Sequence, residues 1–436
     1  MSDLLAARLQ MAWSLGFHIV FAAIGVALPV MMVIAEWRWQ RTRDPVFLEL
    51  AKRWAKGSAI LFAVGAVSGT ALSFELGLLW PRFMALAGPL IGVPFSLEGL
   101  GFFTEAIFLG VYLYGWERIS PRMHLIAGAA VAISAAAGTV FVIMVNAWMN
   151  TPLGFTVANG KLIAIDPIRA MGSAAALPQA LHMLLAAYAS TGLAVAGMHA
   201  WLLRRDARSR FHRYALAVAL CVGAPAALLQ PLSGDLSARL VARTQPVKLA
   251  ALEGQFQTTR GAPLRIGGLP DATARETRWA IEIPRGLSLL AFHDPDAEVM
   301  GLDAFPEKDW PPVAVVHVAF QLMIVLGSAM AAVSAWAGWV AWRRHTLAGH
   351  RSLLLALAVV TPFGFVATQA GWAVTEVGRQ PWVVQGLLRT ADAVTVMPHL
   401  WAPFSVFGLL YLGLAAVVAV LIAGLVREGA TSGPLG

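Results

Sequence analysis

Residues 12–36 read AWSLGFHIVFAAIGVALPVMMVIAE, and the only Asp, Glu, Lys or Arg among them is the terminal Glu36. A helix needs about 20 predominantly apolar residues to cross a bilayer, so this run predicts a membrane-spanning helix. We expect it to be retained, because no basic segment or small-residue cleavage site marks it as a secretory signal. Eight similar runs follow, at approximately 58–80, 95–116, 125–148, 179–203, 214–233, 313–342, 352–374 and 400–426. The sequence therefore predicts an all-α, polytopic membrane helix bundle with nine transmembrane helices.

The composition of the whole chain supports this class. Of the 436 residues, 58% are hydrophobic and only 13% are charged, about half the charged fraction of a soluble domain. A disordered chain and a disulfide scaffold are excluded as well, because the polar excess of the first and the cysteine density of the second are absent. The formal net charge of +8 does not indicate a nucleic-acid partner, since the basic residues lie in short loops between apolar runs.

The distribution of Lys and Arg predicts the orientation, because cytoplasmic loops are richer in both. One side of the predicted bundle carries seventeen of them, namely Arg38, Arg41, Arg43, Lys52, Arg53, Lys56, Arg118, Arg122, Arg204, Arg205, Arg208, Arg210, Arg213, Arg343, Arg344, Arg351 and Arg427. The other side carries six in its short segments, namely Arg8, Arg82, Lys161, Arg169, Arg379 and Arg389. We therefore expect the N-terminus outside and the C-terminus in the cytoplasm.

One long polar segment, residues 234–312, divides the chain. It separates helices one to six (1–233) from helices seven to nine (313–436), and the predicted orientation places it on the outer face. Gly267, Gly268, Pro270 and Pro284 punctuate it. That pattern predicts turns and short helices rather than a separate folded domain.

Ionisable side chains inside a membrane are costly and are functional candidates by default. The candidates are His18, Glu75, Glu98, Glu105, His182, His199, His317 and Glu376. Most fall in the outer third of their predicted helices, with Glu98 opening helix three and Met323 at a similar depth in helix seven. This convergence favours a redox cofactor site over a transport path, because imidazole and thioether are common axial donors to haem iron.

Glu98 and Glu105 are seven residues apart on one predicted helix, which places them on one face about 10 Å apart. Two carboxylates stacked in this way are suited to relay protons outward from the cytoplasm. The alternative is a structural pairing with an Arg or a Trp N–H of another helix. For the other histidines a plainer role is expected: interface anchoring for His124, His199, His212, His345 and His350, and solvation for His293 and His399. His317 stays ambiguous.

Several local motifs carry a resemblance to subunit I of the cytochrome bd-type quinol oxidases along nearly the whole chain. They are Arg8-Leu9-Gln10-Met11 before His18, Leu97-Glu98-Gly99, Phe102-Phe103-Thr104-Glu105, Gly115-Trp116, Asn146-Ala147-Trp148-Met149, Lys248-Leu249-Ala250-Ala251-Leu252-Glu253, Gly371-Trp372, and Glu376-Val377-Gly378-Arg379-Gln380-Pro381-Trp382. The last is the most specific. The family's nine helices and outer quinol-binding loop also agree with the topology derived above.

The resemblance implies a ligand set. His182 and Met323 would be the axial pair of a low-spin haem b. His18 and Glu376 would serve the high-spin pair, with Glu376 at the high-spin haem b and Glu98 at haem d. Which of the two high-spin haems each of His18 and Glu376 serves stays open.

The resemblance implies further roles around these ligands. Glu105 would relay protons toward Glu98, and Lys248 and Glu253 would bind quinol. The residues implied to support the haems are Gln321, Trp372, Arg379 and Trp382. If the quinol segment is helical, Lys248 and Glu253 lie about 140° apart with apolar residues between them; without the resemblance, a surface helix with two solvated charges is the alternative.

Three departures from the family pattern concern the haem sites. Glu98 and Glu105 are one residue closer than in the long-loop enzymes. Gln321 stands where many members have Arg, and the outer loop is short. These traits resemble the cyanide-insensitive branch, so the resemblance implies either haem d or a haem b in its place at the oxygen site.

The predicted function is that of a terminal oxidase that oxidises ubiquinol or menaquinol outside and reduces O2 to water with cytoplasmic protons, so that charge separates without pumping. The implied partners are a second membrane subunit and, optionally, a small single-helix subunit, in a bacterial cytoplasmic (inner) membrane. The rival is a secondary transporter using intramembrane carboxylates, which predicts interrupted helices and a midplane site; the sequence indicates neither. A third alternative is a di-haem membrane anchor without oxygen chemistry. It would explain His182 and Met323 but would give His18, Glu98 and Glu376 no role.

Overall fold

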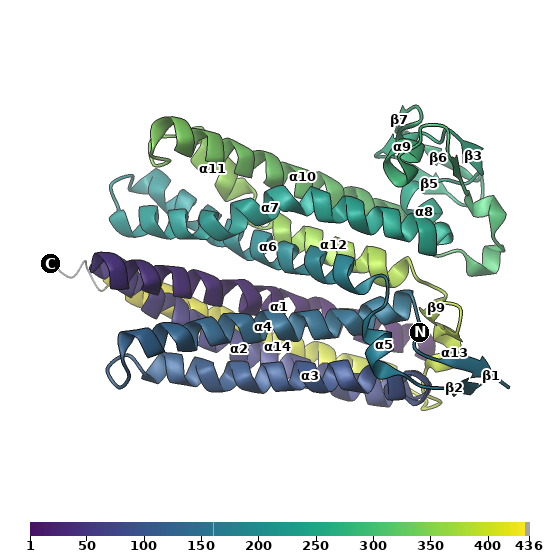
Figure 1. Cartoon of the computed structure of the whole chain (residues 1–436), viewed down its shortest axis with the longest axis horizontal. Helices are drawn as coiled ribbons and strands as arrows, with labels where there is room; N and C mark the ends of the chain where they lie inside the picture. The colour runs from purple at the N-terminus through teal and green to yellow at the C-terminus, as the bar shows by residue number, and fades with distance from the viewer. Residues whose placement is uncertain (160, 432–436) are drawn as a thin grey trace.

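A computed structural model describes residues 1–159 and 161–431, and within them nine helical segments are long and apolar enough to cross a membrane. They lie side by side along one direction (Figure 1). The segments are α1 (Asp3–Thr42), α2 (Pro45–Leu79), α3 (Pro81–Tyr114), α4 (Pro121–Asn150), α6 (Ala176–Arg205), α7 (Arg210–Thr244), α10 (Val313–Arg344), α11 (Arg351–Val359) with α12 (Phe363–Val377) as one span, and α14 (Trp401–Thr431). The predicted helical membrane bundle is confirmed.

Small residues let the helix backbones approach closely. A Cβ added at Gly192 on α6 would lie 2.5 Å from the Cα of Gly223 on α7, and one added at Gly364 on α12 would lie 2.4 Å from the Cα of Ser190. Such contacts are typical of membrane bundles, where helix association depends on packing rather than on the hydrophobic effect. They hold α6 between α7 and α12.

Several helices extend beyond their apolar runs, and for α3 and α7 the extension changes the predicted organisation. Helix α3 begins at Pro81 although the sequence predicted its start near 95, because Pro81 occupies the first turn and the helix continues through Pro89 and Pro94. Helix α7 continues to Thr244, past the predicted boundary at 233, and an ion pair between Arg239 and Asp235 joins successive turns of the extension. Glu98 therefore lies in the middle of its helix, and the expectation that it opens helix three is wrong.

The eighth span is interrupted, which the sequence did not indicate. Residues between α11 and α12 form a turn at Thr361 and Pro362, and proline lacks the N–H that a continuous helix requires. Gly197 of α6 packs directly on the break, since a Cβ added there would lie 2.0 Å from the Thr361 Oγ1. The expectation of an uninterrupted helix over 352–374 is corrected accordingly.

A cap, defined here as residues 245–312, covers one end of the bundle, which we call the loop end (Figure 1). It contains helices α8 (Pro246–Glu253) and α9 (Gly286–Phe292), the short 3-10 helices Leu302–Ala304 and Glu307–Asp309, and strands β3 (Thr259–Arg260), β4 (Leu264–Ile266), β5 (Leu269–Asp271), β6 (Glu276–Arg278), β7 (Ile281–Ile283) and β8 (Glu298–Val299). The strands pair antiparallel as β3 with β8, β4 with β7, and β5 with β6. The expectation of turns and short helices missed these strands, which are only two or three residues long.

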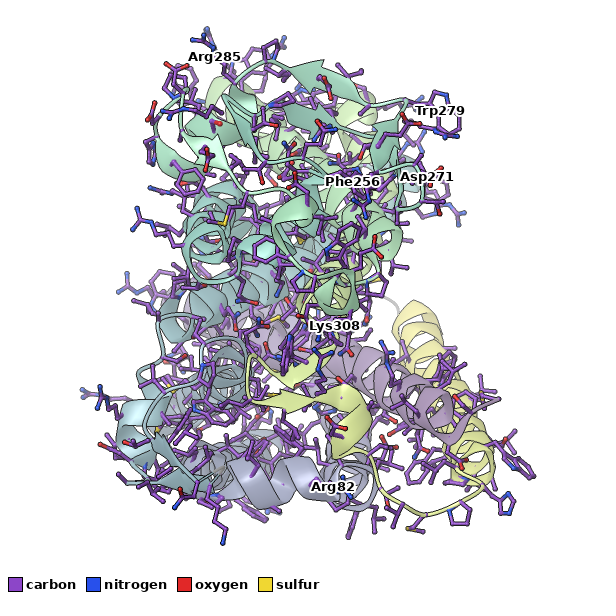
Figure 2. The ribbon with its side chains drawn as sticks, turned by 90° about the vertical axis from the view of Figure 1, so that its right-hand side faces the viewer. Arg82, Phe256, Asp271, Trp279, Arg285 and Lys308 are labelled. Atoms are coloured by element: carbon purple, nitrogen blue, oxygen red, sulfur yellow. The ribbon has the colours of Figure 1, made fainter. Side chains whose placement is uncertain are left out.

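The cap has its own apolar core. Leu252, Phe256 and Leu302 pack on Val313 and Val316 at the start of α10. Figure 2 looks onto the loop end, where Phe256 lies inward of Trp279 and Arg285 on the rim. The exposed fractions agree, at 4% for Phe256 and 82% for Trp279. The cap is therefore fixed to the bundle.

Smaller elements share the loop end with the start of α1 (Figure 1). They are the hairpin of β1 (Thr156–Ala158) and β2 (Lys161–Ile163), helix α5 (Pro167–Met171), the pair β9 (Trp382–Val384) and β10 (Leu388–Arg389), and helix α13 (Thr390–Ala393). An Arg389–Asp309 ion pair joins β10 to the cap. The sequence segments predicted to share one side of the membrane thus gather at one end.

Candidate functional site

His18 is held by a serine on the neighbouring helix. Its Nδ1 lies 2.9 Å from the Oγ of Ser68, and that hydroxyl donates to the carbonyls of Val64 (2.9 Å) and Gly65 (3.0 Å). Because the hydroxyl proton is used in this way, the imidazole Nδ1–H must donate to Ser68. The Nε2 lone pair is left available, which is the arrangement of a metal-ligating histidine with a fixed tautomer.

His182 repeats this arrangement on α6 and α7. Its Nδ1 lies 2.9 Å from the Oγ of Ser233, whose hydroxyl donates to the Gln230 carbonyl at 2.9 Å. The same argument makes Nδ1–H the donor and leaves a lone pair on Nε2. The Gln230 amide nitrogen lies 3.1 Å from that Nε2, and its Oε1 is buried without a partner. The same nitrogen lies 3.3 Å from Nδ1 and 3.2 Å from the His182 carbonyl oxygen, so Gln230 packs beside the ring and not on the Nε2 lone-pair axis.

Cross-helix contacts bring His18, His182 and Met323 to a common level. The Thr191 hydroxyl on α6 donates to the Ala23 carbonyl on α1, and a Cβ added at Gly371 on α12 would lie 3.1 Å from the Met323 Sδ. At 1.5 Å of rise per residue, these registers place the three side chains within about 10 Å of one another along the helix axes. The common depth predicted from sequence is found in the structure.

Glu98 and Glu105 lie on one face of α3. The Phe102 ring between them stacks on Phe62 of α2 at 5.2 Å, which puts Glu98 within about one turn of the level of His18. Both side chains are partly buried. Among the described residues neither carboxylate has an ion pair or hydrogen bond, so the structural pairing with Arg or a Trp N–H is not observed here.

Glu376, at the end of α12, is the centre of a polar network. Its Oε1 accepts from the Asn146 amide at 2.5 Å, and its Oε2 accepts from the Arg379 guanidinium at 2.5 Å. Asn150 donates to the Asn146 Oδ1 at 3.2 Å. The Lys248 Nζ then donates to the Asn150 Oδ1 at 3.3 Å and to the Thr375 carbonyl at 3.2 Å. Sequence reasoning quoted the motif around Asn146 but assigned neither asparagine a role.

Lys248 and Glu253 are both buried, each with 4% of its surface exposed. The segment is helical, as predicted, and the alternative of two solvated charges is wrong. Burial lowers the pKa of Lys248 to about 7, with the charge of Arg379 acting in the same direction. Burial raises the pKa of Glu253 to about 7, opposed by the charge of Arg265. Both groups can therefore exchange protons near neutral pH.

The cap is tied to α10 beside Glu253. His317 is fully buried, with Nδ1 2.7 Å from the Leu252 carbonyl and Nε2 3.0 Å from the Gly267 carbonyl. Gln321 donates to the Arg265 carbonyl at 3.1 Å and accepts from the Gly267 N–H at 3.0 Å. Both side chains therefore use their polar atoms on the cap backbone; a haem-supporting role for Gln321 stays a prediction.

The polar atoms left unpaired fit an anionic group near Glu376. Arg379 is 2% exposed, yet its Nε and Nη1 have no partner. Buried guanidinium donors cost free energy unless a carboxylate or similar anion satisfies them, and the propionates of a haem would do so. Trp372 and Trp382 are half-buried nearby in sequence, and Trp382 stacks under Arg389 at 4.6 Å. The donor set of His, Met and Glu also suits haem iron.

Comparisons with known proteins identify the family of the chain. The family described as cytochrome bd terminal oxidase subunit I matches residues 6–430. A Bacillus subtilis (strain 168) protein, provisionally named a cytochrome bd menaquinol oxidase subunit I, is 39% identical over 97% of this chain and 96% of its own length. The Escherichia coli (strain K12) cytochrome bd-II ubiquinol oxidase subunit 1 is 25% identical over 98% and 96%.

A solved structure gives the same result. The bd oxidase from Geobacillus thermodenitrificans superposes with a TM-score of 0.91 at 38% identity, covering 98% of this chain and 99% of that one. These matches extend over the helices, the cap and every candidate ligand. The chain therefore belongs to the cytochrome bd terminal oxidase subunit I family of haem-containing quinol oxidases.

Proposed function

We propose that this chain oxidises quinol at the loop end, on the outer face of a bacterial inner membrane, and reduces oxygen to water with protons drawn from the cytoplasmic end. The relatives are named for menaquinol and for ubiquinol, and either quinol fits the proposal. The released quinol protons stay outside while the consumed protons come from inside, so charge separates without a pump. A second membrane subunit completes the enzyme.

The observation that carries the proposal is the buried network from Lys248 through Asn150 and Asn146 to Glu376. It joins the quinol-binding segment of the cap directly to a proposed haem ligand. Lys248 and Glu253 would contact the two quinol oxygens, and Glu253 in its carboxylate form would accept a quinol proton. The quinol site and a proposed haem ligand would then lie at the same end of the bundle.

The proposed ligands are those that the family resemblance implies, and the geometry of the two histidines supports them. His182 and Met323 would hold a low-spin haem b, and His18 and Glu376 would hold the high-spin pair, with Glu98 at the third position, which takes haem d or a haem b. Bound haem supplies the one-electron and oxygen chemistry. Ser68 and Ser233 would keep the two histidines in the ligating tautomer, and Arg379 would bind propionate.

Glu105 and Glu98 would carry protons toward the oxygen site. They lie about 10 Å apart along one face of α3, and neither is engaged by another described side chain. Glu105→Gln would keep the shape and remove the titratable group, so we expect haems to stay bound while oxygen consumption falls by roughly 100-fold or more. Unchanged oxygen consumption across the pH range would exclude the relay.

The quinol assignment is tested by comparing two electron donors on the purified complex. Lys248→Ala and Glu253→Ala should slow quinol-driven oxygen uptake and leave uptake with a small artificial reductant unchanged. Equal loss with both donors would mean that the substitution damaged the haem region. No loss with either donor would show that quinol binds elsewhere.

A further inference from the structure

A buried ionisable cluster lies at the end of the bundle opposite the cap, where α1, α3 and α4 meet. The His124 Nδ1 lies 2.9 Å from the Glu36 Oε1, and the His124 Nε2 lies 2.9 Å from the Tyr112 carbonyl. Glu36 and Tyr112 are fully buried and His124 is 2% exposed. The expectation that His124 anchors the interface is therefore wrong. Glu36 was overlooked because it closes an apolar run.

The hydrogen-bond pattern requires one proton between Glu36 and His124. The Tyr112 carbonyl accepts only, so the His124 Nε2 must carry a hydrogen. A neutral imidazole of that tautomer has a lone pair on Nδ1, which would repel a carboxylate oxygen at 2.9 Å. Either the carboxyl is protonated or the imidazole is doubly protonated, and in both cases the pair shares one transferable proton.

The cluster is connected to the surface at that end. The Gln40 amide donates to the Glu36 Oε1 at 2.9 Å and to the Pro121 carbonyl at 2.6 Å, and Gln40 is itself half-buried. From α2, the Lys52 ammonium lies 5.3 Å from the centroid of Trp116, whose ring packs on His124. Among the described residues, Gln40, Lys52 and the Tyr112 hydroxyl are the polar and charged groups near the pair.

Tyr112 continues from the cluster toward the oxygen site. Its hydroxyl and the Glu36 Oε2 are both buried, and the two groups interact with each other. The Tyr112 ring packs against Gly128 of α4, where an added Cβ would lie 2.7 Å from the Tyr112 Cε2. Gly128 lies one helical turn beyond His124 on α4, so the Tyr112 side chain extends from the pair toward the level of Glu105. Tyr112, Glu105 and Glu98 follow one another at seven-residue intervals and share one face of α3.

We propose that Glu36, His124 and Tyr112 form the proton-uptake site for oxygen reduction, delivering cytoplasmic protons to Glu105. This inference rests on the proposed function, because it extends the proposed relay to the cytoplasmic surface. Neither the family resemblance nor the ligand set assigns these three residues a role.

The step balances without a further reactant. A proton from water enters the Glu36–His124 pair as the proton already held there passes to the Tyr112 hydroxyl, which releases its own hydrogen through intervening water to Glu105. One O–H or N–H bond breaks for each that forms, and tyrosine carries no net charge before or after the transfer. Four such transfers accompany the four electrons from two quinols that convert O2 to two waters.

The sharpest test is Tyr112→Phe, assayed in the complete oxidase. Phenylalanine keeps the ring and its packing and removes only the hydroxyl that faces Glu36, so a purely structural cluster predicts normal haem binding and near-normal turnover. Tyr411→Phe is the matched control, because its hydroxyl is also buried and also lies near a carboxylate, that of Glu75, but on α14, beside Phe17 and away from the cluster. We expect Tyr112→Phe to slow oxygen uptake by about tenfold or more with quinol and with an artificial reductant alike, with a larger solvent isotope effect and an unchanged haem spectrum.

Glu36→Gln and Glu105→Gln complete the experiment. If Glu36→Gln also slows turnover and shifts its pH profile while haem content is normal, the uptake site is supported. If the oxygen uptake of Tyr112→Phe and Glu36→Gln equals that of Tyr411→Phe while Glu105→Gln slows it, the uptake site is refuted and the Glu105–Glu98 relay stands. If Glu105→Gln is also normal, the proposed relay itself fails. Should Glu36→Gln lose its haems, Tyr112→Phe alone decides.

Discussion

Ser233→Ala removes the acceptor that fixes the His182 imidazole. The Nδ1–H of His182 donates to the Ser233 Oγ at 2.9 Å, and Ser233 is only 2% exposed, so water cannot replace the lost acceptor. A buried donor without a partner costs about 1–3 kcal/mol. Since about 1.4 kcal/mol is tenfold in affinity, low-spin haem should bind about 10- to 100-fold more weakly, the range typical of second-shell partners of metal ligands.

The assay is haem retention in the purified complex, followed by the reduced-minus-oxidised spectrum while a haem scavenger is added. Ser237→Ala is the matched control, because its hydroxyl donates to the Ser233 carbonyl on the same helix and makes no contact with His182. The low-spin band should be lost faster in Ser233→Ala, with the high-spin bands retained. Equal retention in the two variants would refute the tautomer argument. Ser68→Ala should show the converse loss, at the haem ligated by His18.

Three further predictions concern the quinol site, a ligand and the packing. Burial raises the pKa of Glu253 to about 7, so its proton-accepting carboxylate forms as pH rises through about 7. Quinol-driven oxygen uptake should therefore rise over that pH range. If the rise persists in Glu253→Gln, the assignment is contradicted. Met323→Leu keeps the volume but removes the sulfur, so the low-spin haem b band should change in difference spectra; an unaltered band would disprove the ligation. Gly364→Ala places a Cβ 2.4 Å from the Ser190 Cα, and the resulting overpacking, which costs about 1–3 kcal/mol, should lower the Tm. Gly408→Ala is the control and should leave the Tm unchanged, because no atom lies within 4 Å of its added Cβ. Equal Tm values for the two variants would argue against the close α6–α12 contact.

Much of the fold could be predicted from the sequence because the bilayer imposes a length and a polarity on each helix. The nine apolar runs gave the spans, and the rarity of intramembrane charge pointed to His18, His182 and Glu98. The helix ends were harder. The third helix was predicted to start near residue 95, yet α3 begins at Pro81 and continues through Pro89 and Pro94, because Phe83, Leu90 and Ile91 are buried there.

The polar contacts of the site could not be predicted, because they depend on the register between helices. Nothing in the sequence aligns Ser68 with His18 or Asn150 with Lys248. Glu36 was missed for a related reason. It lies where an apolar run meets basic loop residues, so it was not counted among the intramembrane candidates, and only helix packing buries it against His124. Residue type predicted the ligands, whereas their supporting partners required the three-dimensional structure.

The central claim is that quinol protons are released at the loop end while the protons for water enter from the opposite end. It is tested most directly by following pH on both sides of proteoliposomes that contain the complete oxidase in one orientation, during quinol-driven oxygen consumption. We predict one proton released on the loop side and one taken up on the opposite side for each electron transferred. Release and uptake on the same side would contradict the account.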